Sequence, residues 1–175
     1  WPVLWSFHKV HHTAETLTPF TVYRTHPVEG VLFALRSALV QAFVLAVFVF
    51  FFGERIELMA VFGANVFVFA FNVLGANLRH SHIRIGYGRI LERVFISPAQ
   101  HQVHHSVDPR HHDRNFGAVL ALWDWMGGSL YLADTDEDIR FGVADVEPAP
   151  HGLRAVYLRP FAEAAARVRR FFDWR

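Results

Sequence analysis

Residues 101–105 read His-Gln-Val-His-His, and residues 8–12 near the start of the chain read His-Lys-Val-His-His. We call these two segments, both of the pattern His-x-x-His-His, the histidine boxes. On an α-helix, positions i, i+3 and i+4 lie on one face, so each box is predicted to direct three imidazoles to one point. Neutral imidazole is a ligand for iron, zinc, copper and nickel. One such box can arise by chance among 12 histidines, but two boxes predict metal binding.

The composition is apolar for a chain of this length. The 175 residues suit one domain; 53% of them are hydrophobic, 18 are Phe, and the mean hydropathy is +0.20. These values lie at the upper edge for a soluble protein and indicate burial in a membrane. The net charge of +1 gives no electrostatic case for a nucleic-acid partner. The lack of cysteine excludes disulfides, iron–sulfur ligation, thiolate haem and a cysteine nucleophile.

Two long apolar runs lie between the boxes, within residues 30–78. The first extends from Val31 to Phe52, and the second from Leu58 to Leu78. Each reaches the roughly 20 residues that a helix needs to cross a bilayer, and Arg36 could extend to the headgroups. The sequence therefore predicts a transmembrane hairpin. A buried helical hairpin of a soluble protein is the alternative.

A membrane hairpin would return the chain to the side that it left, so both boxes would lie at the same membrane face. That face also carries most of the basic residues: Lys9, Arg24, Arg79, Arg84, Arg89 and Arg93. The opposite turn has only Arg55, between two glutamates. Because cytoplasmic loops are rich in Lys and Arg, we expect a multi-pass membrane protein whose histidine-rich face is cytoplasmic.

Helix boundaries can be placed beside both boxes and at the C-terminus. Pro27 and Ser97-Pro98 have the residue types that begin helices. From Phe161 the chain has apolar residues at helical spacing, which predicts an amphipathic helix that either lies on the membrane or packs on the protein itself. The single domain thus divides into residues 1–29, the hairpin 30–78, a histidine-rich cap 79–135, and the C-terminal part 136–175. The predicted class is an all-α membrane bundle with a cytosolic helical cap.

The histidines outnumber the ligands of one metal ion, since two triads and His80 exceed what a single ion accepts. A two-metal centre is therefore predicted. The chain has no Glu-x-x-His repeat, no His-Glu-x-x-His, no Gly-x-Ser-x-Gly elbow and no phosphate-binding glycine loop, which argues against several carboxylate, hydrolase and nucleotide sites. A cluster of histidines with few carboxylates suits oxygen activation by iron better than hydrolysis.

A set of motifs in a fixed order carries a family resemblance. The motifs are residues 4–12, 23–27, 79–81, 98–106 and 113–117, followed by Trp123-Asp124. The sequence resembles the fatty acid hydroxylase/sterol desaturase superfamily of integral-membrane, non-haem di-iron oxygenases. The resemblance implies these metal ligands: His8, His11, His12, His80, His101, His104 and His105. It also implies that Asn115 and Asp124 support the ligand-bearing helix without binding metal, and it implies no further catalytic residue.

Three departures from the family pattern bear on this transfer. The family's first histidine box belongs upstream of Trp1, and the chain begins without an initiator Met, so we expect a sequence truncated at its N-terminus. Residues 126–129 replace the usual Phe-Gly-Thr, which affects local packing. His82 stands where the family requires no histidine and is a further candidate ligand. The remaining histidines have simpler interpretations: structural for His26, loop or interface for His111 and His112, and surface for His151.

The sequence thus predicts a membrane-bound, O2-dependent di-iron oxidoreductase that hydroxylates or desaturates a fatty acyl or sterol-like lipid. Its cofactors would be two iron ions, with zinc as a substitute in purified material. Its electrons would come from a separate electron-transfer protein, because the chain has no haem, flavin or iron–sulfur motif. The alternatives are a membrane metal-binding or transport protein, in which ligands should lie inside the spans, and a zinc-dependent lipid hydrolase.

Overall fold

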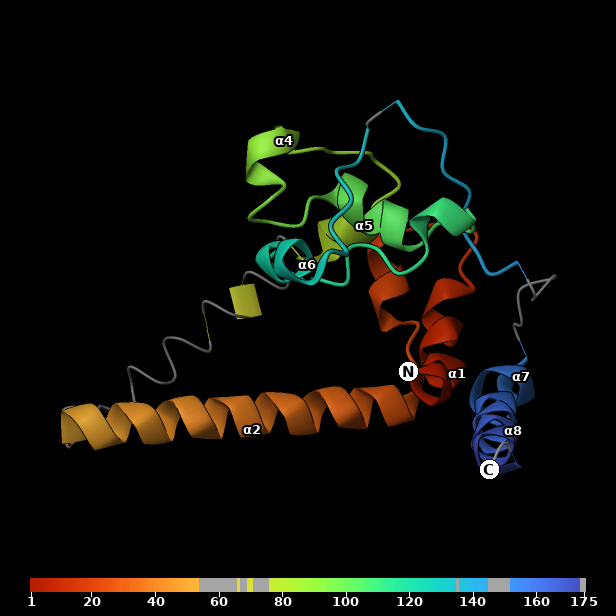
Figure 1. The fold of residues 1–175 in the computed structure, drawn as a ribbon, viewed down its shortest axis with the longest axis horizontal. Coiled ribbons are helices and arrows are strands. Elements are labelled where there is room, and N and C mark those ends of the chain that lie inside the picture. Colours follow the sequence, from red (N-terminus) through yellow and green to blue (C-terminus); the bar gives the residue numbers. More distant parts are fainter. Residues whose placement is uncertain (54–65, 67–68, 71–75, 135, 145–151, 174–175) are drawn as a thin grey trace.

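The computed structural model describes residues 1–53, 66, 69–70, 76–134, 136–144 and 152–173 (Figure 1). Most of these residues are helical, which confirms the all-α part of the predicted class. Within the described ranges no strand forms, and two isolated bridges pair Phe95 with Leu120 and Ser106 with Phe141. The membrane bundle, the cytosolic position of the cap and the division into segments stay predictions.

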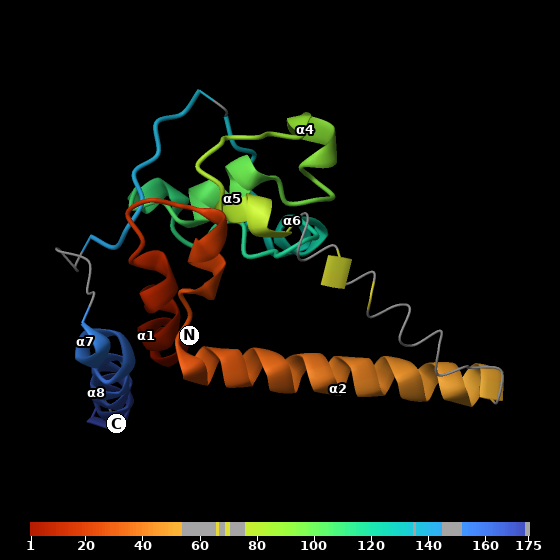
Figure 2. The same ribbon diagram turned by 180° about the vertical axis from the view of Figure 1, so that it is seen from behind.

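The longest element is α2 (Pro27–Phe52), which extends away from the rest of the molecule (Figures 1 and 2). It begins at Pro27, as predicted from the sequence. At about 1.5 Å per residue, its 26 residues extend about 39 Å, more than the roughly 30 Å of a bilayer's hydrocarbon core. None of the residues in its most apolar 18-residue stretch is buried against the rest of the protein. Among the described helices α2 alone is long and apolar enough to cross a membrane, and the second predicted run, 58–78, falls mostly outside the described residues.

Short elements make up both the predicted cap 79–135 and residues 1–29, and from here on the word cap covers the two together. In chain order these are α1 (Pro2–His12), η1 (Pro19–Tyr23), η3 (Ala76–His80), α4 (Gly88–Leu91), α5 (Pro98–His104), η4 (Pro109–His111) and α6 (Leu122–Gly127). Helix α5 begins as predicted. The Gln100 N–H donates to Ser97 Oγ (3.1 Å), and the Ser97 N–H donates to Gln100 Oε1 (3.0 Å). This reciprocal cap fixes the start of the helix that carries the second box.

The interior of the cap is mainly polar. Few hydrophobic side chains are fully buried in the described part, among them Leu17, Ala99 and Val103, whereas histidines, Gln100 and Glu92 occupy the centre. Buried polar groups destabilise a fold unless they find partners. The interior thus depends on contacts between polar side chains as well as on apolar packing.

The C-terminal helices α7 (Leu153–Tyr157) and α8 (Arg159–Asp173) return to the N-terminal part of the chain. Helix α8 packs on α1, where the rings of Phe7 and Phe161 meet at 5.3 Å and Lys9 forms an ion pair with Glu163. His26 caps α2 by accepting from the Val28 N–H (3.2 Å), and its other nitrogen lies 3.1 Å from the Tyr157 carbonyl. The structural interpretation of His26 is confirmed.

Candidate metal centre

All seven predicted ligands come together in two adjoining groups of histidines. His11, His80, His101 and His105 form one group, which we call the closed cluster; His8, His12 and His104 form the other, the open cluster. In each cluster the potential ligand nitrogens lie within 4.8 Å of one another. The rings of His12 and His105 stack at 4.4 Å, so the clusters share a boundary.

The prediction that each box directs three imidazoles to one point is wrong. In the first box, His8 and His12 join the open cluster and His11 joins the closed one. In the second box, His101 and His105 join the closed cluster and His104 the open one. The reason is angular: positions i and i+4 differ by about 40° around a helix, while i+3 lies about 60° to the other side of i.

The contacts inside the closed cluster fit a cation better than hydrogen bonds. His80 Nε2 lies 2.9 Å from His11 Nε2 and 3.0 Å from His101 Nε2, and His101 Nε2 lies 3.2 Å from His105 Nε2. An imidazole nitrogen carries either one hydrogen or one lone pair, so hydrogen bonds can satisfy at most two of these three contacts. Nitrogens about 3 Å apart are the spacing expected of neighbouring ligands that bind an ion at about 2.1 Å.

Burial keeps the imidazoles of the closed cluster neutral. Desolvation, reinforced by the neighbouring His80, lowers the pKa of His11 from 6.5 to about 3. Desolvation, with Arg79 nearby, lowers the pKa of His80 to about 4. The same cause holds the pKa of His101 and of His105 well below the usual range. Since neutral imidazole is the metal-binding form, these residues are ready to bind metal at neutral pH.

The open cluster is held differently, through hydrogen bonds to the outer ring nitrogens. His8 Nδ1 contacts the Glu29 carboxylate, and His104 Nδ1 donates to the Arg114 carbonyl at 2.9 Å. Each bond places the ring hydrogen on Nδ1 and leaves a lone pair on Nε2. His8 Nε2 then lies 3.0 Å from His12 Nε2. Trp5 covers the rings of His8 and His12 from one side, with centroids at 5.9 and 5.1 Å.

Glu29 is the residue of this site that sequence reasoning missed. Its place in the first turn of the helix that begins at Pro27 is a common one for an acidic residue, because negative charge is favoured there. The structure buries it and pairs it with His8, from which it is 21 residues distant. No local pattern indicates this pairing, because it depends on how the start of α2 packs against α1.

Two polar side chains, Gln102 inside the second box and Asn115 after it, connect α5 to neighbouring segments by hydrogen bonds. Gln102 Nε2 donates to the Ser81 carbonyl (2.9 Å), which keeps the segment after His80 beside α5. Buried Asn115 donates to the carbonyls of Gln100 (3.1 Å) and Tyr131 (3.0 Å) and accepts from the Tyr131 N–H (2.8 Å). Asn115 therefore lies where the resemblance implied, against the ligand-bearing helix.

Asp124 acts one step further from the histidines. Its carboxylate accepts from the N–H groups of Phe116 (2.8 Å) and Gly117 (2.7 Å) and from the Ser129 hydroxyl (2.6 Å). These bonds fix the turn that follows Arg114, whose carbonyl orients His104. Asp124 thus supports His104 through this turn, and its negative charge partly offsets the lowering of the His104 pKa by burial.

The other histidines lie apart from the clusters in the described residues. His82 and His112 are exposed, and His151 falls outside the described residues. His111 is buried between the Ser106 hydroxyl and the Glu137 carboxylate, each at 2.9 Å, so it ties two loops together. His111 is the last residue of the short 3-10 helix η4 and is buried, so its interpretation as a loop or interface residue is wrong.

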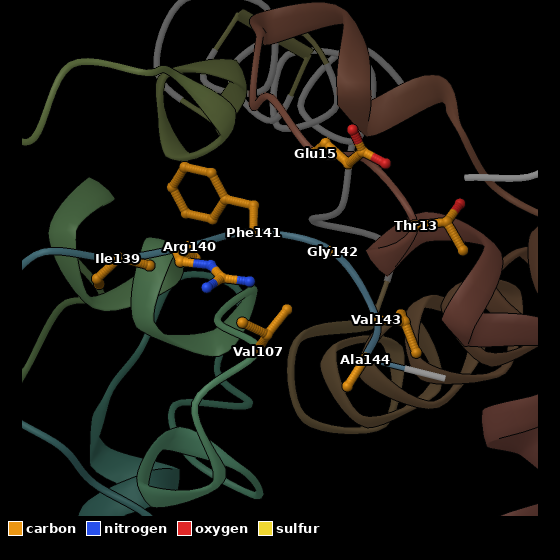
Figure 3. Close-up of a pocket in the computed structure, with 9 residues that line it drawn as sticks. All are labelled: Thr13, Glu15, Val107, Ile139, Arg140, Phe141, Gly142, Val143 and Ala144. Carbon is orange, nitrogen blue, oxygen red and sulfur yellow. The ribbon is translucent and has the colours of Figure 1, made fainter. Parts of the chain in front are cut away.

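A pocket of about 520 Å³ opens beside the ends of both boxes (Figure 3). Its lining residues are Thr13, Glu15, Val107, Ile139, Arg140, Phe141, Gly142, Val143 and Ala144. None of the seven clustered histidines lines it. This pocket is therefore separate from the two histidine clusters.

The sequence model of the family described as "Fatty acid hydroxylase" matches residues 1–129, which include both histidine boxes and His80. The chain belongs to this family. Among curated proteins, it is similar to the alkylglycerol monooxygenase of Danio rerio, with 29% identity over 131 residues, which is 73% of this chain and 25% of that protein. The alkylglycerol monooxygenase of Caenorhabditis elegans is 27% identical over 147 residues, 82% of this chain and 25% of that protein.

The chain thus spans about a quarter of the length of these relatives. No solved structure gave a significant match. The matched relatives are monooxygenases by name, which agrees with an oxygenase family whose histidines can hold metal.

Proposed function

We propose that this chain forms the catalytic core of a membrane-bound, O2-dependent oxidoreductase that hydroxylates or desaturates a lipid. One observation carries the proposal: seven histidines from three separate segments converge in two adjoining clusters. Membership of the fatty acid hydroxylase family and the similarity to monooxygenases support it.

Two iron ions are the proposed cofactors, one in each cluster. His11, His80, His101 and His105 would hold one ion, and His8, His12 and His104 would hold the other. Bound iron supplies the O2 activation and C–H oxidation that protein side chains cannot perform. Zinc can occupy the same nitrogens in purified material. Electrons would come from a separate electron-transfer protein.

The protein's own residues prepare the site and shield it. Burial keeps the closed cluster neutral, while Glu29 and the Arg114 carbonyl hold the rings of the open cluster in the tautomer that presents Nε2. Trp5 and Phe116, whose ring lies 5.9 Å from that of His104, give the open cluster an apolar border. An alkyl chain would approach the metals across this border.

The membrane supplies the substrate in this proposal. Helix α2, with residues 58–78 as a second span, would cross the bilayer and hold the cap at its cytoplasmic face. The substrate would be a lipid with an alkyl or acyl chain. The names of the relatives add alkylglycerols to the fatty acyl and sterol-like lipids that the family resemblance implies.

The test measures metal content and O2 consumption of the full-length protein in detergent, with a chemical reductant and a panel of acyl lipids, sterols and alkylglycerols. We expect about two irons per chain and lipid-dependent O2 consumption, both reduced in His8→Ala and His101→Ala. A protein that binds two irons, accepts electrons and consumes no O2 with any of these lipids would contradict the proposal. Metal uptake into sealed vesicles in place of oxidation would support the transport alternative.

A further inference from the structure

Helix α8 presents an apolar stripe that α1 covers only in part. At 100° per residue, one side of α8 carries Phe161, Ala164, Ala165, Val168, Phe171 and Phe172. Helix α1 covers the edge of this stripe, where Pro160 and Ala164 are buried. Phe161, Val168 and Phe172 remain 51%, 40% and 65% exposed in the described structure. The apolar stripe is therefore wider than the contact with α1.

Arginines border the stripe. By the same helical geometry, Arg167 and Arg169 lie on its two sides, and Arg159 and Arg170 lie on the opposite face. Glu163 is engaged by Lys9 and by Arg159, whose Nε lies at 2.9 Å. Basic side chains beside an apolar stripe suit a helix that lies at an anionic lipid surface, with the stripe among the acyl chains and the arginines at the headgroups.

The position of α8 places this stripe at the start of the proposed membrane span. Tyr157, just before α8, bonds to the capping residue His26 of α2, and the rings of His26 and Phe161 meet at 5.3 Å. Because α2 is longer than the hydrocarbon core, its first turns can extend through the headgroup layer. Figures 1 and 2 show α8 running across the direction of α2, as a helix in the membrane plane would.

We propose that α8 lies in the headgroup layer of an anionic membrane, with Phe161, Val168 and Phe172 inserted among the acyl chains. The inference rests on the proposed crossing of the membrane by α2. Lipid is the occupant that the features favour. Exposed Arg169 borders the open edge of the stripe, half-buried Arg167 borders the edge that α1 covers, and the stripe lies beside the start of the proposed span. Because α8 packs on α1, this contact would hold the first histidine box at the level of the lipid surface.

The 175 residues contain no cysteine, so single nitroxide labels can be placed in them once cysteines elsewhere in the full-length protein are replaced by serine. Val168→Cys reports on the stripe, and Ala166→Cys is the matched control on the opposite, exposed face of α8. Phe43→Cys, in the exposed middle of α2, reports on the span. Each full-length variant is placed in lipid nanodiscs of phosphatidylcholine with a minority of phosphatidylglycerol. Relaxation of the label by O2 measures lipid exposure, and relaxation by a water-soluble nickel complex measures water exposure.

We expect the labels at 168 and 43 to be several-fold more accessible to O2 than to nickel, and the label at 166 to show the reverse. A label at 168 that nickel reaches, or that neither reagent reaches, overturns the placement of α8. The label at 43 separates the two proposals: if it is lipid-exposed, failure at 168 concerns α8 alone, whereas failure at 43 refutes the membrane crossing itself.

The headgroup contact has its own test in the Val168→Cys background. Replacing Arg167 and Arg169 together by Gln should reduce the ratio of O2 to nickel accessibility several-fold in the anionic discs. The same replacement should have little effect in discs of phosphatidylcholine alone. An unchanged ratio in the anionic discs would contradict the proposed role of the arginines.

Discussion

The closed and open clusters use the same side chain and hold it in opposite ways. In the closed cluster, the Nδ1 atoms of His80, His101 and His105 are buried and find no hydrogen-bond partner among the described residues. In the open cluster, His8 and His104 have Nδ1 partners, and the His8 side chain is 33% exposed. Under the proposed function, the buried closed cluster would retain an ion away from water, and the more exposed open cluster would be the side from which substrate and O2 arrive.

The largest effect is expected from removing a ligand of the closed cluster. His101→Ala should lower the iron content by about one ion per chain and reduce lipid-dependent O2 consumption by about 100-fold or more, since a buried three-ligand remnant holds metal weakly. Elemental analysis and oxygen-electrode measurements test this. His82→Ala, which removes an exposed histidine outside both clusters, should change neither value. Two irons retained in His101→Ala would mean that the closed cluster is not a metal site.

A smaller effect is expected where the open cluster is anchored. Glu29→Gln keeps the shape of the side chain but weakens its hold on His8 Nδ1, so metal affinity of the open cluster should fall by about 10- to 100-fold. Competition with a chelator of known affinity should show weaker binding of one ion and unchanged binding of the other. Asp136→Asn, an exposed acid in a loop, is the control. Equal weakening of both ions would argue against a separate open cluster.

The pH dependence of the metal-free protein should reflect the closed cluster. Its histidines have folded-state pKa values below the unfolded value of 6.5, with His80 at about 4, so the unfolded state binds more protons between these values. Stability is therefore full above about pH 6.5 and falls as the pH drops toward 4. We expect the Tm to fall by at least about 5 °C between pH 7 and pH 5.

The control for this prediction is a change inside the closed cluster. His105→Phe removes one of the buried imidazoles, so its Tm should fall less over the same pH range, whereas His82→Ala should behave like the parent. A Tm that is flat, or that rises on acidification, would contradict the neutral, desolvated state of these rings.

The smallest effect is expected at the border of the open cluster. Trp5→Ala should leave the metal content unchanged but raise, by several-fold, the rate at which a chelator removes the more accessible ion, because Trp5 covers His8 and His12. Trp5→Phe keeps an aromatic cover and should stay near the parental rate. Stopped-flow chelation measures a fast phase, the release of the more accessible ion, and a slow phase, the release of the other ion. If Trp5→Ala also accelerated the slow phase, the two clusters would not differ in access.

Much of this arrangement could be predicted from the sequence because it depends on local patterns. The helix starts at Pro27 and Ser97 follow from residue types and their spacing, and the family resemblance implied the seven histidines that the structure brings together. The apolar spacing from Phe161 onward predicts an amphipathic helix, which the structure shows as α8. The structure adds that α8 packs on α1 along one edge of its apolar stripe.

Other features depend on long-range packing and could not be predicted in this way. The division of each box between two clusters depends on where the other helix and His80 approach it. The pairing of Glu29 with His8, and the burial of His111 against Glu137, join residues that are distant in the chain. The helical pattern indicates which side chains project from the same face of a helix. It does not indicate which residues of other segments pack against that face.

The division of the boxes also couples the two metal positions mechanically. Helix α1 and helix α5 each supply ligands to both clusters, so neither helix can rotate or slide to suit one ion without displacing a ligand of the other. If the two ions of the proposed function are bound, their separation would be set by the pitch and spacing of these two helix backbones. A change of metal at one position would then be transmitted to the other through the helices.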